Sequence, residues 1–269
     1  MKTLVRFLSL AAAVLLCHPV SAQTVTATIA GGQSATYTAG QLRTGLLADK
    51  SYVSVQGTWS PSQIDSLAAS LHTAFNWATW NVTGNDVLTT LDMEDAVFTG
   101  DSISLKGIGF GCSKLREVIL PSTAFDGKVC LTFAFASCTY LYRIEHLDKL
   151  NGICDLSSAF ALCSNLTSVR FSAPKNRNSV SFSAAFSQCR QLQHIENLDS
   201  FIKIKSLSMA FNQCESLTEV LFSSSLKGIG EESYFMSTFS GCKNLTRIDN
   251  LDRFANLYSS GPVYFSEAF

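Results

Sequence analysis

The sequence is poor in charge and has no strong bias of sign. Only 15% of its 269 residues are charged, and the formal net charge is −1. A nucleic-acid-binding surface needs a basic face, so this balance argues against a nucleic-acid partner. No block of like charges marks a charged tail or a helix that lies on a membrane surface.

The usual signals of metal sites and enzymes are also missing. The nine cysteines include no Cys-x-x-Cys pair, the close spacing typical of zinc sites. Three histidines follow residue 22, namely His72, His146 and His194. None has a Cys or Ser partner at the spacing of a known catalytic motif, and each is interpreted as a surface residue. We therefore expect no catalytic residue, no metal site and no cofactor.

Residues 1–22 have the layout of a secretory signal peptide. Lys2 and Arg6 form a basic start, and residues 8–16 form an apolar stretch too short to span a bilayer. Small residues then give a cleavage site after Ala22. No stop-transfer segment follows, so we expect a secreted or cell-surface protein without a transmembrane segment, whose mature chain starts at Gln23.

The chain does contain a repeat. Six cysteines recur at intervals of 26, 25, 26, 25 and 28 residues, and each opens the phrase Cys-x-x-Leu-x-x-[Ile/Val]. Five of them also have a phenylalanine three residues upstream. The cysteines are Cys112, Cys138, Cys163, Cys189, Cys214 and Cys242, and the phenylalanines are Phe135, Phe160, Phe186, Phe211 and Phe239. A period of this length predicts stacked units that share one core.

The repeated Phe, Cys, Leu and Ile/Val residues are predicted to point inward and to form ladders along the stack. Equivalent cysteines on stacked coils lie side by side and do not face each other as a disulfide requires. A buried free cysteine behaves as a small apolar residue, so the six are predicted to be reduced thiols. Cys130 and Cys154 lie off this ladder, and a disulfide between them stays open.

Alternate coils end differently. Those opened by Cys138, Cys189 and Cys242 end in Ile-[Glu/Asp]-x-Leu-Asp, whereas the others do not. The full unit is therefore a pair of coils, 51 to 53 residues long. The final aspartates of this ending, Asp148, Asp199 and Asp252, are interpreted as caps of the turn after the strand, with a cation-attracting stripe as the alternative.

Residues 23–83 are predicted to form an N-terminal cap of strands and helices. Its expected elements are strands at 25–29 and 52–55 and helices at 41–47 and 61–75. The helix at 61–75 is expected to lie across the open end of the stack as the lid that repeat proteins need. Residues 88–93 resemble the strand phrase of a first coil without cysteine.

Residues 263–269 copy the lead-in to Phe186, so the chain stops on the Phe of a seventh unit. Three interpretations stay open. The sequence is a fragment or a truncated product, the last coil folds back imperfectly, or another copy packs on the open end.

The phrase Ala-Phe-x-x-Cys-x-x-Leu-x-x-Ile, as at residues 185–195, resembles the BspA-like leucine-rich repeats of bacterial secreted and surface proteins. The resemblance covers residues 84–269. It implies a leucine-rich repeat solenoid of the α/β class, with short strands, short helical or irregular turns, about six to seven coils of ~25 residues and a small N-terminal α+β cap. It also implies a bacterial adhesin or another binding protein.

Our leading hypothesis is a non-catalytic binding protein that recognises an extracellular protein or glycan through residues flanking the strands. The candidate binding residues are Arg143, Arg170, Gln193, Glu219 and Arg247. The alternative is a structural spacer or assembly module that self-associates through its C-terminal coil.

Overall fold

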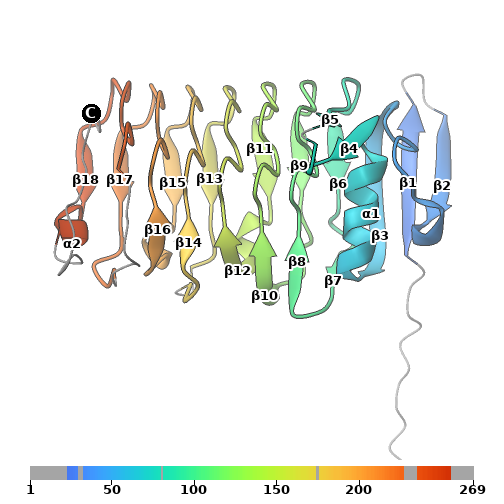
Figure 1. The fold of residues 1–269 in the computed structure, drawn as a ribbon, viewed down its shortest axis with the longest axis horizontal. Coiled ribbons are helices and arrows are strands. Elements are labelled where there is room, and N and C mark those ends of the chain that lie inside the picture. Colours follow the sequence, from blue (N-terminus) through green and yellow to red (C-terminus); the bar gives the residue numbers. More distant parts are fainter. Residues whose placement is uncertain (1–22, 30–32, 80, 174–175, 227–234, 256–269) are drawn as a thin grey trace, which may run out of the picture.

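The computed structural model describes residues 23–29, 33–79, 81–173, 176–226 and 235–255. The predicted signal peptide and the repeated segment at 263–269 lie outside these residues. The described chain forms a rod in which successive coils stack along the long axis (Figure 1). Strands β1 to β3 lie at one end of this stack, and β17, β18 and α2 lie at the other. The predicted solenoid is confirmed.

A first row of parallel strands follows the Leu of the repeat phrase. Each strand is centred on an apolar residue, and Val118 is in register with Leu91 on one side and Ile144 on the other. Because side chains alternate along a strand, this central residue points into the core and its two neighbours point outward. The first strand row consists of β6 (Thr90–Asp92), β9 (Glu117–Ile119), β11 (Arg143–Glu145), β13 (Ser168–Arg170), β15 (His194–Glu196), β17 (Glu219–Leu221) and β18 (Arg247–Asp249).

A second row of strands runs along another side of the rod. These strands form one five-stranded parallel sheet, in which Val129 is in register with Ile103 and Ile153. All three residues are buried and close the core from this side. The second strand row consists of β8 (Ser102–Ser104), β10 (Phe125–Cys130), β12 (Leu150–Asp155), β14 (Val180–Ser181) and β16 (Ile204–Ser206).

The tight turns between the second and first rows use left-handed backbone. The residue before a ladder cysteine has a positive φ, as in Ser137 (65°), Leu162 (66°) and Gln188 (63°), and glycines 111 and 241 occupy the same place. This conformation is costly for residues that carry a Cβ atom. The stacking of the coils therefore stabilises these turns, although the residues in them prefer a negative φ.

The predicted phenylalanine ladder is confirmed. The rings of Phe135, Phe160, Phe186, Phe211 and Phe239 stack with successive centroid distances of 5.9, 5.3, 5.8 and 5.6 Å. Their interplanar angles are 18° or less. Near-parallel rings at these separations are a preferred aromatic arrangement, and the stack adds to the burial of each side chain.

The cysteine ladder is buried as predicted, except that Cys242, in the last described coil, is half-buried. The thiols of the five ladder cysteines from Cys138 onward also donate a hydrogen bond to a carbonyl oxygen of the preceding coil, whereas Cys112 Sγ accepts one from the Asn85 N–H at 3.4 Å. The Sγ atoms of Cys163 and Cys189 lie 3.1 and 3.0 Å from the oxygens of Phe135 and Phe160. The repeat pattern predicts apolar behaviour for these thiols and does not reveal this bond.

Asn85 takes the place of the cysteine in the first coil. Its Nδ2 donates to the carbonyl oxygens of Leu47 and Lys50 at 3.0 and 3.2 Å, and its Oδ1 accepts from the backbone N–H groups of Val87 and Leu88. The side chain is 1% exposed, and all its bonds are internal. A single amide thus joins the first coil to the N-terminal region.

The N-terminal region begins with strand β1 (Thr24–Ile29), which lies antiparallel between β2 (Ser34–Thr38) and β3 (Lys50–Trp59). Strand β3 pairs in parallel with β6 and with β7 (Ala96–Phe98), which joins the region to the first coil. Helix α1 (Pro61–Ser70) and the hairpin of β4 (Ala74–Asn76) and β5 (Asn81–Thr83) complete it.

Both predicted helices of this region differ from the structure. Where a helix at 41–47 was expected, residues 42–49 form irregular backbone and turns after a single 3-10 turn at Ala39–Gln41. Helix α1 ends at Ser70. Both differences have the same cause. The backbone N–H groups of Gly45 and Leu47 donate to the carbonyl oxygens of Ala69 and Ser70 at the end of α1. Helix α1 packs beside β8, and β2 is the outermost element at this end (Figure 1). The helix is therefore not the lid.

The prediction that the aspartates cap the turns is wrong. The turn after β11, β15 or β18 starts at His146, Asn197 or Asn250, which have φ values of 60°, 60° and 58°. The amides of the two asparagines donate to carbonyl oxygens of the preceding coil at 2.8 Å. The aspartates come two residues later, inside the short 3-10 helices Leu147–Lys149 and Leu198–Ser200 and at the start of α2 (Asp252–Ala255).

Candidate functional site

The structure places all five candidate binding residues on or next to the first strand row. The side chains of Arg143, Arg170 and Arg247 are 55%, 65% and 58% exposed. Glu219 is partly exposed, and Gln193 is exposed directly before β15. Since the central residue of each strand points inward, these neighbours form an outward face that follows the rod.

Ion pairs join the two coils of each repeat unit across this face. Arg143 Nη1 lies 2.8 Å from Glu117 Oε1, and Arg170 Nε lies 3.4 Å from Glu196 Oε2. Arg247 pairs in the same way with Glu219, at 3.6 Å. The hydrogen bond from Arg143 to Glu117 and the charge of nearby Glu145 raise the pKa of Arg143.

These pairs make the charge pattern of the face alternate rather than favour one sign. Exposed ion pairs contribute little to stability because water and salt screen them. Their side chains can therefore exchange an internal partner for a ligand at small cost. This arrangement suits recognition by geometry and hydrogen bonding more than attraction of a strongly charged partner.

The three histidines do not form a common site. His194 is exposed on β15 and His146 is half-buried. His72, predicted at the surface, is fully buried, with Nδ1 2.8 Å from the Ala68 oxygen and Nε2 3.2 Å from the Phe110 oxygen. It follows α1, and its ring lies 5.0 Å from that of Phe75 in β4. Burial lowers its pKa, although the hydrogen bonds to both carbonyls oppose the shift. Within the described residues, His, Cys, Asp and Glu side chains nowhere gather in a group that could hold a metal ion.

The cysteines are unpaired throughout the described chain. Burial raises the pKa of Cys112 to about 12 and that of Cys242 to about 11, so the ladder thiols are poor nucleophiles. Cys130 and Cys154 lie on neighbouring strands of the second row and are only half-buried. Cys154 Sγ donates to the Val129 oxygen at 3.3 Å.

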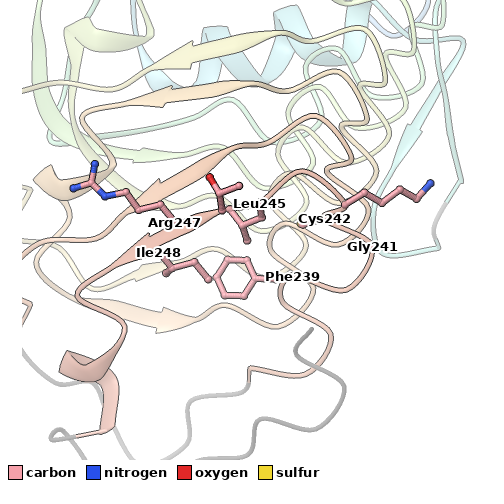
Figure 2. Close-up of a pocket in the computed structure, with 8 residues that line it drawn as sticks. Phe239, Gly241, Cys242, Leu245, Arg247 and Ile248 are labelled. Carbon is pink, nitrogen blue, oxygen red and sulfur yellow. The ribbon is translucent and has the colours of Figure 1, made fainter.

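A hollow of about 430 Å³ lies at the last described coil (Figure 2). Phe239, Leu245 and Ile248 gather in it, and Arg247 extends away from them. Cys242, Leu245 and Ile248 are half-buried, whereas the equivalent residues of the preceding coil are buried. The core side chains of this coil are therefore partly open within the described structure.

A second hollow lies on the outward face of the first strand row. We call it the tyrosine groove; its volume is about 330 Å³ and its lining is Arg116, Tyr140, Tyr142, Asn165, Thr167 and Gln191. Tyr140 and Tyr142 are 55% and 49% exposed, among the most exposed large side chains of the described residues. The repeat pattern does not predict this groove, because the residues that line it occupy positions that vary from coil to coil. The phrase Tyr-Leu-Tyr after Cys138 was the available signal.

A match to a protein-family model agrees with this architecture. The model of the BspA type leucine rich repeat region matches in six copies, over residues 90–208 and 157–261. A crystal structure of a T. pallidum leucine-rich repeat protein is 23% identical, with 63% of this chain and 73% of that chain covered and a TM-score of 0.34. A leucine-rich repeat protein from Bacteroides ovatus is 18% identical, with 66% and 61% covered and a TM-score of 0.28.

No curated protein matches the sequence. Among the described residues, none of the helices has the length and apolar character needed to cross a membrane.

Proposed function

Because the chain belongs to the BspA-type leucine-rich repeat family, we propose that it is a non-catalytic, adhesin-type binding protein, secreted or displayed on a bacterial surface. Its ligands would be host matrix proteins, cells or glycans. The layout of residues 1–22 supports export, since it has the basic start, apolar stretch and cleavage site of a signal peptide.

One observation carries this proposal. Seven first-row strands, β6 to β18, present partly or fully exposed outward side chains in line, most of them polar, on a support of stacked core residues. Repeat proteins use such extended surfaces for binding. Contacts repeated along the rod would each be weak and would add up in a large ligand.

The test is a binding array of extracellular-matrix proteins and glycans, probed with the mature chain from Gln23. We expect a saturable signal that falls at least tenfold in the triple variant Arg143→Ala, Arg170→Ala, Arg247→Ala. Lys128→Ala is the matched control, because Lys128 is an exposed basic residue on β10 of the second row. An equal loss in the control, or binding unchanged in the triple variant, contradicts the proposed face.

End-to-end assembly is a second candidate function, favoured by the hollow at Phe239, Leu245 and Ile248. Apolar side chains left open at a coil end form a surface on which a second copy can stack. Light scattering of the mature chain tests this directly. Concentration-dependent growth that Leu245→Glu abolishes would support assembly, whereas a strict monomer at all concentrations would exclude it.

A further inference from the structure

The tyrosine groove combines rings, amides and one cation on a single face. It crosses four coils, with Arg116 on the first, both tyrosines on the second, Asn165 and Thr167 on the third, and Gln191 on the fourth. Three strand spacings separate the first coil from the last, or roughly 14 Å. The groove is therefore long and shallow.

The two tyrosines offer flat apolar surfaces with polar tips. Both are about half-exposed, and neither hydroxyl forms a hydrogen bond within the described residues. Side chains of this kind are favoured where a partner has an apolar face and polar edges. A pyranose ring has this character, because its C–H groups form one face and its hydroxyls surround the edge.

The amides next to the tyrosines are held in place. Gln191 Nε2 donates to Asn165 Oδ1 at 3.1 Å, and Asn165 Nδ2 donates to the Thr139 carbonyl oxygen at 2.9 Å. This chain of bonds fixes the direction of both amides before any ligand binds. An amide offers both donors and acceptors, which matches the hydroxyls of a sugar.

Arg116 supplies the charge. The other arginines of the first strand row, Arg143, Arg170 and Arg247, are ion-paired. Arg116 is exposed and forms no ion pair in the described part of the chain. Its carbonyl oxygen accepts the Tyr142 N–H at 3.1 Å, so the two residues are neighbours on adjacent coils. A free guanidinium beside an aromatic ring suits a carboxylate, which it can bind through two parallel hydrogen bonds.

From these contacts we infer that the tyrosine groove binds a glycan through a sugar that bears a carboxylate, a sialic or a uronic acid. The sugar ring lies on Tyr140 or Tyr142, its carboxylate pairs with Arg116, and Asn165, Thr167 and Gln191 bond its hydroxyls. This inference rests on the proposed binding function and names its ligand class. The small volume of the groove favours a short saccharide over a folded protein domain.

The experiment uses the mature chain and matched pairs of probes. These are 3′-sialyllactose against lactose, and tetragalacturonate against its neutral methyl ester, measured by saturation-transfer NMR and calorimetry. We expect saturable binding of at least one acidic probe, at least tenfold tighter than its neutral match. A charge-assisted hydrogen bond to a carboxylate accounts for about this factor.

Three variants locate the site. Tyr142→Ala should weaken acidic and neutral probes alike by about tenfold or more, since ring stacking serves both. Arg116→Gln should remove most of the preference for the acidic probe. Lys114→Gln, an exposed cation on the same coil that does not line the groove, should leave binding unchanged. Unchanged thermal unfolding would show that all three variants fold.

Several results would overturn the inference. These are no acidic binding at millimolar concentration, equal binding of acidic and neutral probes, or acidic binding that the two groove variants leave intact. A different result would contradict the proposed binding function. A matrix protein captured through the first strand row without sugar binding would overturn only this inference, whereas no ligand at all on the array would count against both.

Discussion

At the residue scale, the cysteines do two things at once. They fill small buried spaces, and from Cys138 onward each thiol donates to a carbonyl oxygen of the preceding coil. The same carbonyl oxygen also accepts the backbone N–H of the cysteine in that preceding coil. The Phe160 oxygen, for example, accepts from Cys163 N at 3.1 Å and from Cys189 Sγ at 3.0 Å. A weak donor at this position completes the bonding of a buried carbonyl, which explains why cysteine rather than alanine recurs.

Thiol titration checks this account. Nine cysteines less Cys17 leave eight in the mature chain, all unpaired in the structure. With Ellman's reagent at pH 8 we expect the half-buried Cys130, Cys154 and Cys242 to react in the native protein, and the five fully buried ladder thiols to react only on unfolding. If only one thiol reacts in the native protein and six in total react in denaturant, Cys130 and Cys154 form a disulfide.

The left-handed turns give a second prediction. Leu162 has a φ of 66° and is 39% exposed, and the equivalent residues 111 and 241 are glycines. Leu162→Gly should be more stable than Leu162→Ala by about 1 kcal/mol, because only glycine adopts this conformation without steric cost. Urea unfolding measures the difference. The order should reverse at Gln193, whose φ is not positive, and a higher stability of Leu162→Ala would contradict the assignment.

His72 gives a prediction for pH. Burial lowers its pKa in the folded protein, whereas the unfolded chain keeps the usual value of 6.5. Below pH 6.5 the unfolded state therefore binds the extra proton, and stability falls as pH decreases, by up to about 1.4 kcal/mol per unit. The free energy of unfolding at pH 7.5 and 5.5 should show a smaller loss in His72→Gln than in the wild type. A loss in His72→Gln equal to that of the wild type would contradict this account.

At the element scale, the stacked phenylalanine rings join successive coils. Phe186 has a ring on each side, Phe160 at 5.3 Å and Phe211 at 5.8 Å. Phe186→Ala should cost about 3–5 kcal/mol of stability from lost burial and the cavity left behind. Phe186→Leu should cost clearly less, because most of the volume remains. Denaturant unfolding measures both, and a loss below about 1 kcal/mol for the alanine variant would show that the stack contributes little.

The elements differ in how far the sequence could predict them. The ladders were predictable, because the same residue type at the same offset in successive coils leaves one consistent inward face. The ends of α1 were not, because they depend on bonds to Gly45 and Leu47, more than twenty residues away. The role of Asn85 was not predictable for another reason. Asn85 lies 27 residues before Cys112, at the spacing of the repeat, but an asparagine does not match the repeated cysteine.

The candidate site was predicted only in part. The alternation of side chains along a strand is enough to place the strand-flanking residues on one outward face. The structure has them on that face. Their ion pairs within each two-coil unit were not foreseen, nor was the tyrosine groove. Both arise from residues on different coils that vary in type, and only the register of the strands brings them together.

At the scale of the whole molecule, the repeats build a rod with two unlike sides. The first strand row carries exposed charged, aromatic and amide side chains, and the turns between the rows expose Met209 and Met236, which are 38% and 48% accessible. The central claim is that ligands bind the first strand row. This claim concerns the whole surface, so variants at single sites test it only indirectly.

Hydroxyl-radical footprinting of the mature chain with and without a bound ligand tests it most directly. Tyr140 and Tyr142 report on the first strand row, and Met209 and Met236 report on the turns. Our account predicts that the ligand slows oxidation of the tyrosines and leaves both methionines unchanged. Protection of the methionines with fully reactive tyrosines would contradict it.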